Sequence, residues 1–524
     1  RLLTVRFRVR APVHPFLFQL YIMYNMLFMI KHNVEKVLGI FSVSILLGIL
    51  FDYFFFDKGL GIAFPLYILL IVFGLFGISY VYRKKIKKDA LLLLIPLFFF
   101  SVMTAVRSSE LLTFLNIVAC IYLLLLIADL CFDKKISNYL IKDYIVVPFT
   151  PFKFINPFFK SVSELFSLRK KDKDKKVSSQ IVRGILISIP FLIIFILLFS
   201  SADLVFQKYM SDLVSINIEG ETIVRIFLVL LVSCVFVGAY SYIFNVRKEV
   251  IGDKERGLSI GSIESYILLG SVNLLFLLFI SVQITYLFGG QSNISSLGFT
   301  YAQYARKGFF ELIGVAVISF FLLLGLDKYI KREKGNNLRI FNVLSSLLVA
   351  EVVVIMISAF TRLLLYEDAY GFTTLRLYSH VFIIFLTVTF ALLIYKVLKN
   401  GKESNFSLAV FLSVILFLAG MNILNPDAFI AQRNIERFND GKKIDVYYLT
   451  TLSDDALPVT VKMLDISDES VKGEFAYYMY WKMQGRIPSN NWQSFNVSHK
   501  RAKEIIAPKM EILEGYKEYI EEFE

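Results

Sequence analysis

The chain has 524 residues, of which 56% are hydrophobic and 19% are charged, and its mean hydropathy is +0.64. A water-soluble domain of this size does not tolerate such values, so composition excludes an ordinary soluble fold and predicts a polytopic membrane protein. The net charge of +13 does not indicate nucleic-acid binding, because residues 425–524 are net acidic and the positive charge gathers beside apolar stretches, where anionic lipid is the expected partner.

The first segment in chain order is an N-terminal extension, residues 1–36. It opens on Arg1, with four arginines in ten residues, and continues into the apolar run 15–30. Three interpretations stay open: sequence read through ahead of a start at Met29, a loose interfacial helix, or an additional span. A signal peptide is less consistent, because no small-residue cleavage site follows the apolar run.

Eleven apolar stretches follow, each near the roughly 20 residues that a helix needs to cross the hydrocarbon core of a bilayer. Backbone polar groups cannot stay unpaired in lipid, so each stretch is predicted to be a helix. The stretches cover residues 37–56, 62–82, 89–104, 111–131, 181–201, 222–245, 265–287, 308–327, 340–361, 377–398 and 406–424. We therefore predict an all-α transmembrane helical bundle of about 11 spans, four within 37–131 and seven within 181–424, and a small helical tail, residues 425–524.

The hinges between the spans alternate in Lys/Arg content. Those that we assign to the cytoplasm hold 28 Lys/Arg, and the alternate hinges hold seven. The positive-inside rule then places the N-terminus in the cytoplasm. With an odd number of spans, the tail is predicted to be extracytoplasmic, on the outer side of the cell membrane.

The longest cytoplasmic connection, residues 132–180, combines two chemistries. Its first part is rich in Tyr and Phe and is interrupted by Pro148, Pro151 and Pro157, which forbid one continuous helix. Its second part, from Arg169 to Lys176, reads RKKDKDKK and is expected to attract anionic lipid. A solvated determinant of topology and a regulatory site for lipid or a partner both fit this loop.

Four strings carry a resemblance to a known family. They are residues 184–206 (GILISIPFLIIFILLFSSADLVF), 301–312 (YAQYARKGFFEL), 366–378 (YEDAYGFTTLRLY) and 425–458, which begins NPDAFIAQRNIERF. Together they resemble an uncharacterised bacterial membrane family, domain of unknown function 4173, a relative of 4153. The resemblance runs from about residue 37 to 458 and implies a multi-pass membrane protein with a short helical tail. It brings no established activity, substrate or catalytic residue.

Polar residues inside the predicted spans are the first candidates for function. Glu351 lies in the middle of a span, where an ionisable group is costly unless something pairs or solvates it. Its partner must come from another helix, from water, or from a proton of its own, and both a structural hydrogen bond and a proton or solute relay fit. Asn116, Asn273 and Gln283 are predicted first to link helices and second to line a solute path.

A second set of candidates gathers at the predicted outer ends of the spans and mixes both signs of charge. A polar vestibule closed by the hinge 366–376 and a rim of unconnected surface residues both fit this set. The vestibule would consist of Asp203, Arg225, Arg306, Glu311, Arg362, Glu367, Asp368, Tyr370, Arg376 and His380.

Metal and cofactor sites are not predicted. His380 has no second His or Cys within ligand spacing, so we expect it to be an interfacial hydrogen-bond donor. The cysteines Cys120, Cys131 and Cys234 lie in or at the ends of spans without paired spacing and are expected to pack in the bundle.

The tail is predicted to form amphipathic helices near residues 427–438, 454–464 and 470–483. Ser453 would need a base to act as a nucleophile, and His499, the tail's only histidine, falls in an unrelated lysine-rich helix, so hydrolysis is not expected. The residues singled out in the tail are Asn425, Asp427, Arg437, Asp445, Ser453 and Asp455.

Three classes of function follow from these features. The favoured class is a transporter that moves a solute or lipid along a polar path through Glu351 and the vestibule. The second is an envelope sensor or assembly scaffold whose tail binds an envelope protein. The third is a membrane-embedded transferase acting on a lipid-linked substrate, for which no catalytic residue is identified.

Overall fold

The computed structural model describes residues 15–132, 135–167, 220–245, 262–287, 309–329, 336–485 and 491–519. Every regular element in these residues is a helix, which confirms the all-α prediction. The long helices are α1 (Pro15–Phe55), α2 (Ala63–Tyr82), α4 (Leu94–Val106) with the short α3 (Lys88–Leu92) before it, α5 (Glu110–Leu130), α10 (Gly220–Asn245), α11 (Ser262–Leu287), α14 (Phe309–Tyr329), α15 (Asn336–Tyr370), α16 (Thr374–Lys399) and α17 (Glu403–Leu424).

Nine stretches in the described part of the chain are long and apolar enough to cross a membrane. They coincide with nine of the predicted spans, and α14 is helical where a tenth was predicted. The remaining predicted span, residues 181–201, lies outside the described residues.

Two helices extend beyond the predicted spans. Helix α1 begins at Pro15, so residues 15–36 continue into the helix of the first span. Helix α15 has 35 residues and ends only at Tyr370, before Gly371, whose φ of +82° an L side chain rarely adopts. The predicted hinge 366–376 is therefore wrong in length, since only residues 371–373 are non-helical.

The short third span is divided in two. Helix α3 ends at Leu92 and α4 begins at Leu94, with Leu93 between them. Pro96 explains the break, because its ring lacks an N–H and clashes with the carbonyl four residues earlier. Apolar side chains nevertheless continue across the break, and Leu93 and Leu97 are both buried.

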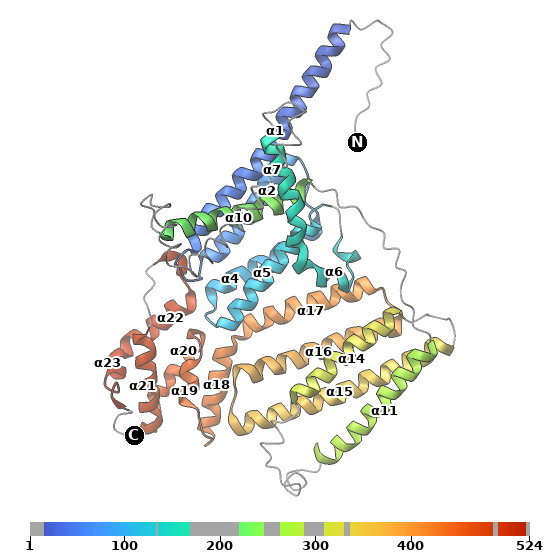
Figure 1. The fold of residues 1–524 in the computed structure, drawn as a ribbon. Helices are drawn as coiled ribbons and strands as arrows, with labels where there is room; N and C mark the ends of the chain where they lie inside the picture. The colour runs from blue at the N-terminus through green and yellow to red at the C-terminus, as the bar shows by residue number, and fades with distance from the viewer. Residues whose placement is uncertain are drawn as a thin grey trace, which may run out of the picture.

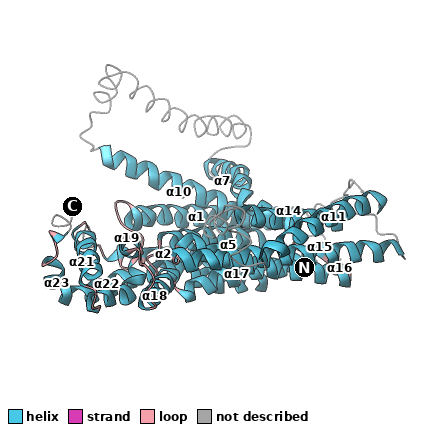
Figure 2. Ribbon diagram, turned by 90° about the horizontal axis from the view of Figure 1, so that it is seen from below, coloured by secondary structure: helices cyan, strands magenta, loops and turns pink. Residues whose placement is uncertain are grey.

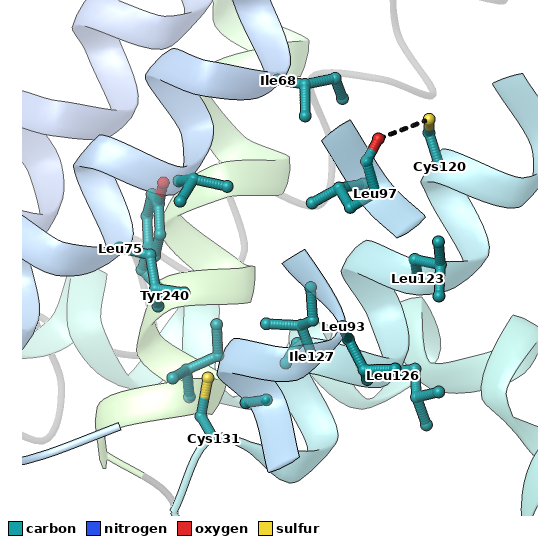
Figure 3. Packing of buried hydrophobic residues seen from close by; sticks show 14 of the residues in the cluster. Ile68, Leu75, Leu93, Leu97, Cys120, Leu123, Leu126, Ile127, Cys131 and Tyr240 are labelled. Carbon is teal, nitrogen blue, oxygen red and sulfur yellow. Dashed lines mark hydrogen bonds between the residues drawn. The ribbon is translucent and has the colours of Figure 1, made fainter. Parts of the chain in front are cut away.

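The helices form two groups, each around its own core (Figure 1). The first core joins α1, α2, α4, α5 and α10, and the second joins α11, α14, α15 and α16. Helix α17 lies between the groups and contributes Phe411 to the first core and Phe406 to the second. Figure 3 shows part of the first core, where the Cys120 thiol lies 3.6 Å from the carbonyl oxygen of Leu97.

The proline-broken connection folds into short helices, as its sequence predicted. They are η1 (Ile136–Asn138), α6 (Ile141–Val146), η2 (Val147–Phe154) and α7 (Ile155–Ser167). Val147 and Phe154 are buried in the first core, so this part of the loop packs against the bundle. The polybasic run 169–176 lies outside the described residues.

The tail is a compact helical unit with a core of its own, which includes Ile430, Leu449, Met463 and Phe475. Its elements are α18 (Pro426–Asn439), α19 (Val446–Thr451), η3 (Asp454–Ala456), α20 (Leu457–Thr460), η4 (Val461–Asp465), α21 (Glu469–Gln484), η5 (Trp492–Ser494), α22 (Val497–Ile506), η6 (Ala507–Lys509) and α23 (Met510–Glu514). Figures 1 and 2 both place it at one end of the long helices.

Candidate functional site

The tail is fixed to the bundle by the carboxylate of Asp455. Its Oδ2 accepts hydrogen bonds from the backbone N–H groups of Ser108 (2.7 Å) and Ser109 (3.1 Å), in the hinge between α4 and α5. Its Oδ1 accepts one from the Ser498 hydroxyl (2.5 Å) and lies 3.6 Å from the guanidinium of Arg107. Because the Asp455 side chain is only 1% exposed, these contacts replace water almost completely.

Helix α22 holds the same hinge from the other side. The amide of Asn496 donates to the carbonyls of Thr104 (3.3 Å) and Arg107 (2.8 Å), and the Ser498 hydroxyl oxygen lies 2.9 Å from the carbonyl oxygen of Val106. Arg107 in turn donates to the carbonyl of Asn422 at the end of α17. The tail therefore satisfies backbone groups that the end of α4 leaves unpaired.

A second attachment lies at the turn between α15 and α16. The Asn434 side chain accepts from Phe372 N (2.7 Å) and donates to Phe372 O (2.9 Å). A Cβ on Gly371 would lie 2.7 Å from side-chain atoms of Asn434 and Arg437, so this contact requires glycine. The tail therefore contacts the turn between α15 and α16, which was predicted to be an outer hinge. This contact is consistent with the prediction that the tail and this hinge lie on the same side of the bundle.

A pocket of about 1230 Å³ lies between the tail and this end of the bundle. Its walls come from the start of α5, from residues 451–454, and from α22. One wall holds a His–Asp contact, in which His499 Nδ1 lies 2.7 Å from Oδ2 of the buried Asp454. The expectation that His499 belongs to an unrelated helix is therefore wrong, because α22 folds back against η3.

Of the predicted tail residues, Asp427 and Ser453 line this pocket, and Asn425, Arg437, Asp445 and Asp455 do not. The Asp427 carboxylate accepts from Ser453 N (3.3 Å). Burial raises the pKa of Asp427 above its usual value. Asp445 caps α19 by accepting from Tyr448 N (2.8 Å), and the Asn425 amide donates to the Asp455 carbonyl (3.4 Å).

The predicted vestibule residues do not all come together. Arg225 on α10 forms a bidentate pair with Asp52 on α1, in the first helix group. Asp368 pairs with Lys442 of the tail, Arg376 donates to the Gly371 carbonyl, and the Arg437 guanidinium donates to the Asp368 carbonyl. Glu311 and Tyr370 are exposed, whereas Asp203 and Arg306 lie outside the described residues.

Buried ionisable residues instead follow α15 and α16 from one end of the second helix group to the other. Near the tail, His380 Nδ1 lies 3.2 Å from Glu367 Oε1, and Arg362 is buried one turn further along α15. Toward the opposite end, Lys396 forms an ion pair of 2.7 Å with Asp327 on α14, in which both side chains are at most 5% exposed. Glu351 lies near the middle of α15.

Glu351 differs from its neighbours. It is 3% exposed, and neither carboxyl oxygen has a hydrogen-bond partner among the described residues. Seven residues before it, the Leu344 carbonyl accepts from Asn273 (3.2 Å), and seven residues after it, Ser358 donates to Gln283 (2.5 Å). Asn273 and Gln283 thus link α11 to α15, as predicted, on either side of a carboxyl group that they do not contact.

Sequence reasoning missed several residues of the pocket. Asp454, Lys482, Asn496 and His499 had no recognisable spacing, because their partners lie far away in the chain. The described residues hold no group of three or more His, Cys, Asp or Glu side chains placed to bind a metal ion.

The helical bundle and its apolar spans define an integral membrane protein. Residues 94–463 match the model of a family described as a domain of unknown function, DUF4153, and this chain belongs to that family. The matched family is the one that the sequence analysis named as a relative, and the resemblance to the domain of unknown function 4173 stays a prediction. The match includes Glu351 and Asp455 but ends before His499. No curated protein and no solved structure matches the chain.

Proposed function

We propose that this chain is a transporter of the cell membrane, with the tail outside, in which solute movement is coupled to protonation of Glu351. The second helix group provides the path, because six ionisable side chains are buried along it: Asp327, Glu351, Arg362, Glu367, His380 and Lys396. Each would cost at least about 2.5 kcal/mol in a bilayer centre without compensation. Groups of this kind mark ion and proton pathways in membrane proteins.

The observation that carries the proposal is that the Glu351 carboxyl has no hydrogen-bond partner among the residues that the structure describes. A buried carboxyl without a partner is more stable as the neutral acid, because ionisation would leave a charge without solvent. Helices α15 and α16 form a hairpin whose two arms meet at the Glu367–His380 contact. Glu351 lies 16 residues before Glu367 on α15, and Lys396 lies 16 residues after His380 on α16. Ionised Glu351 would therefore lie near the depth of Lys396 and could compete with Asp327 for it.

Proton entry into proteoliposomes tests this proposal. The purified chain is reconstituted, a potassium diffusion potential is imposed, and internal pH is followed with trapped pyranine. We expect entry above that of protein-free liposomes, and we expect Glu351→Gln to remove it, because the amide cannot carry a proton. Glu311→Gln, at an exposed position on α14, is the matched control. Equal entry with the native protein and Glu351→Gln would contradict the proposal.

The His499–Asp454 contact favours a second candidate, the membrane-embedded transferase. A buried carboxylate that holds one imidazole nitrogen is the arrangement of a general base, and Nε2 remains for a substrate hydroxyl or water. Ser453 has no hydrogen bond to His499. Turnover of a radiolabelled phospholipid that is lost in His499→Gln would support this candidate, and no turnover by the native protein would count against it.

The exposed aromatic side chains of Tyr447 and Trp481 give the tail a surface that a partner protein could cover. An envelope scaffold thus remains a proposal. If it is correct, tail deletion changes the set of co-purifying proteins, and an unchanged set removes it.

A further inference from the structure

We propose that the pocket beneath the tail and an apolar groove beside it form one binding site for a membrane amphiphile whose phosphate headgroup carries a net negative charge. The site lies in the first helix group and the tail. The site does not include Glu351, so the result of its test does not depend on whether the proposed proton-coupled path exists.

One wall of the pocket carries lysine side chains. Helix α22 places Lys500 and Lys503 there, and Lys482 of α21 is held in place by the carbonyls of Thr450 (2.7 Å) and Leu452 (2.6 Å). Of the acidic lining residues, Asp454 contacts His499, Asp427 accepts from Ser453 N, and Glu110 lies exposed at the start of α5.

Of the α22 lysines, Lys500 has only a long, exposed contact of 3.7 Å with Glu504. Exposed pairs of this kind are weak and do not prevent a lysine from binding another anion. Lysine donors suit the oxygens of a phosphate group.

The groove has a volume of about 590 Å³ and lies among α1, α2, α5 and α10. All its lining residues are apolar or aromatic. Its two tyrosines do not present free hydroxyl groups, because Tyr67 donates to the Leu47 carbonyl (3.0 Å) and Tyr240 to the Ile71 carbonyl (2.9 Å). It runs from Leu60, near the tail, to Ile243 at the opposite end of α10, and its chemistry fits an acyl chain.

Two elements join the pocket to the groove. On α5, Glu110 lines the pocket and Ile117, seven residues later on the same helix face, lines the groove. In the loop after α1, Ile62 N donates to the carbonyl of Phe495 (2.9 Å), and Phe495 lines the pocket while Leu60 lines the groove. A headgroup in the pocket and a chain in the groove can therefore belong to one molecule.

The pocket meets the groove at the level of the membrane where lipid headgroups are expected. Trp492 lines the pocket, is half-exposed, and packs against Phe54 (5.9 Å between ring centroids) and Tyr53 (6.5 Å) at the end of the first span. Exposed Trp and Tyr at the ends of spans are typical of the interfacial layer.

Tryptophan fluorescence can test the site, because the chain has two tryptophans and Trp481 is outside the pocket. In a Trp481→Phe background, Trp492 reports on ligands added to the detergent-solubilised full chain. We expect saturable binding of dihexanoylphosphatidylglycerol, whose headgroup carries a net negative charge. Binding should be about tenfold weaker for dihexanoylphosphatidylcholine, whose headgroup has no net charge, and for glycerol 3-phosphate, which lacks the chains.

Two test variants, each with a matched control, show separately whether the pocket binds the headgroup and the groove binds the chain. Lys500→Gln with Lys503→Gln should weaken phosphatidylglycerol binding about tenfold, whereas Lys472→Gln, outside the pocket, should not. Ile121→Phe, which fills the groove, should weaken it, whereas Val118→Phe, exposed on α5 outside the groove, should not. Equal binding of the two lipids would mean ordinary lipid contact. Full-strength binding of glycerol 3-phosphate would mean a site for free phosphate. Either result, or no effect of both test variants, overturns the proposal.

Discussion

Asn116 on α5 and Asn422 on α17 exchange two hydrogen bonds of 2.8 Å, each amide donating to the oxygen of the other. Both side chains are fully buried. The Asn422 carbonyl also accepts from Arg107, so one residue of α17 connects the first helix group with the hinge that the tail holds. The prediction that Asn116 links helices is therefore confirmed by its contacts, and its partner is the last polar residue of α17 before the tail.

Asn422→Ala should lower the free energy of unfolding by about 1–2 kcal/mol, because it leaves the buried Asn116 amide without its partner. Unfolding of the purified protein by SDS or heat measures this loss. Asn405→Ala, at an exposed position on the same helix, should change stability by less than about 0.5 kcal/mol. Asn116→Val with Asn422→Val should recover part of the loss, since neither amide then remains unpaired. A loss in the double variant equal to the sum of both single losses would contradict this account.

Asp455→Ala should release the tail from the bundle. The carboxylate is buried and satisfies two backbone N–H groups, so its removal should cost about 3–5 kcal/mol. We expect faster hydrogen exchange at Ser108 and Ser109 and faster proteolysis between the tail and α17. Asp465→Ala, which removes an exposed pair with Lys509, is the control and should alter neither. Unchanged exchange in Asp455→Ala would show that other contacts suffice to hold the tail.

The Lys396–Asp327 pair predicts a non-additive pair of mutations. Lys396→Met or Asp327→Leu alone should destabilise the protein by about 3–5 kcal/mol, because a charge is left buried. The combined variant should be close to the native protein in stability, since an apolar pair of similar size needs no desolvated charge. Thermal unfolding gives the coupling free energy. Lys399→Met, at an exposed position one turn away, is the control. Additive losses would mean that the two side chains are not coupled.

Asp427 predicts a pH dependence of the tail. Burial raises its pKa in the folded state from the ordinary value of 3.8, so the folded state binds a proton more readily than the unfolded state. Its stabilising contribution is full below pH 3.8 and is lost as pH rises through the raised pKa. Melting followed by tryptophan fluorescence reports on the tail, which contains both tryptophans. We expect the melting temperature to fall less in Asp427→Asn than in the native protein as pH rises from 3.8 toward neutrality. Asp440→Asn, at an exposed position, should keep the native difference.

The sequence by itself determined the class and most of the spans. Length and apolarity suffice for this, because a bilayer demands about 20 apolar residues in a helix wherever the chain crosses it. The same local rules predicted the break at Pro148, Pro151 and Pro157. The local rules failed at the end of α15. Polar residues such as Glu367 are helical there because they contact His380 and the tail.

Only the tertiary structure decided which polar groups meet. Asp455 contacts a hinge 347 residues away and His499 contacts a carboxylate 45 residues away, and no spacing in the sequence encodes either distance. Glu351 could be recognised from the sequence as a costly group, but only the packed helices show that its carboxyl has no hydrogen-bond partner in the part of the chain that the structure describes. Hydrophobic burial depends on composition and can be read locally, whereas a hydrogen bond depends on the position of two atoms to within a few tenths of an ångström, which only the packed helices fix.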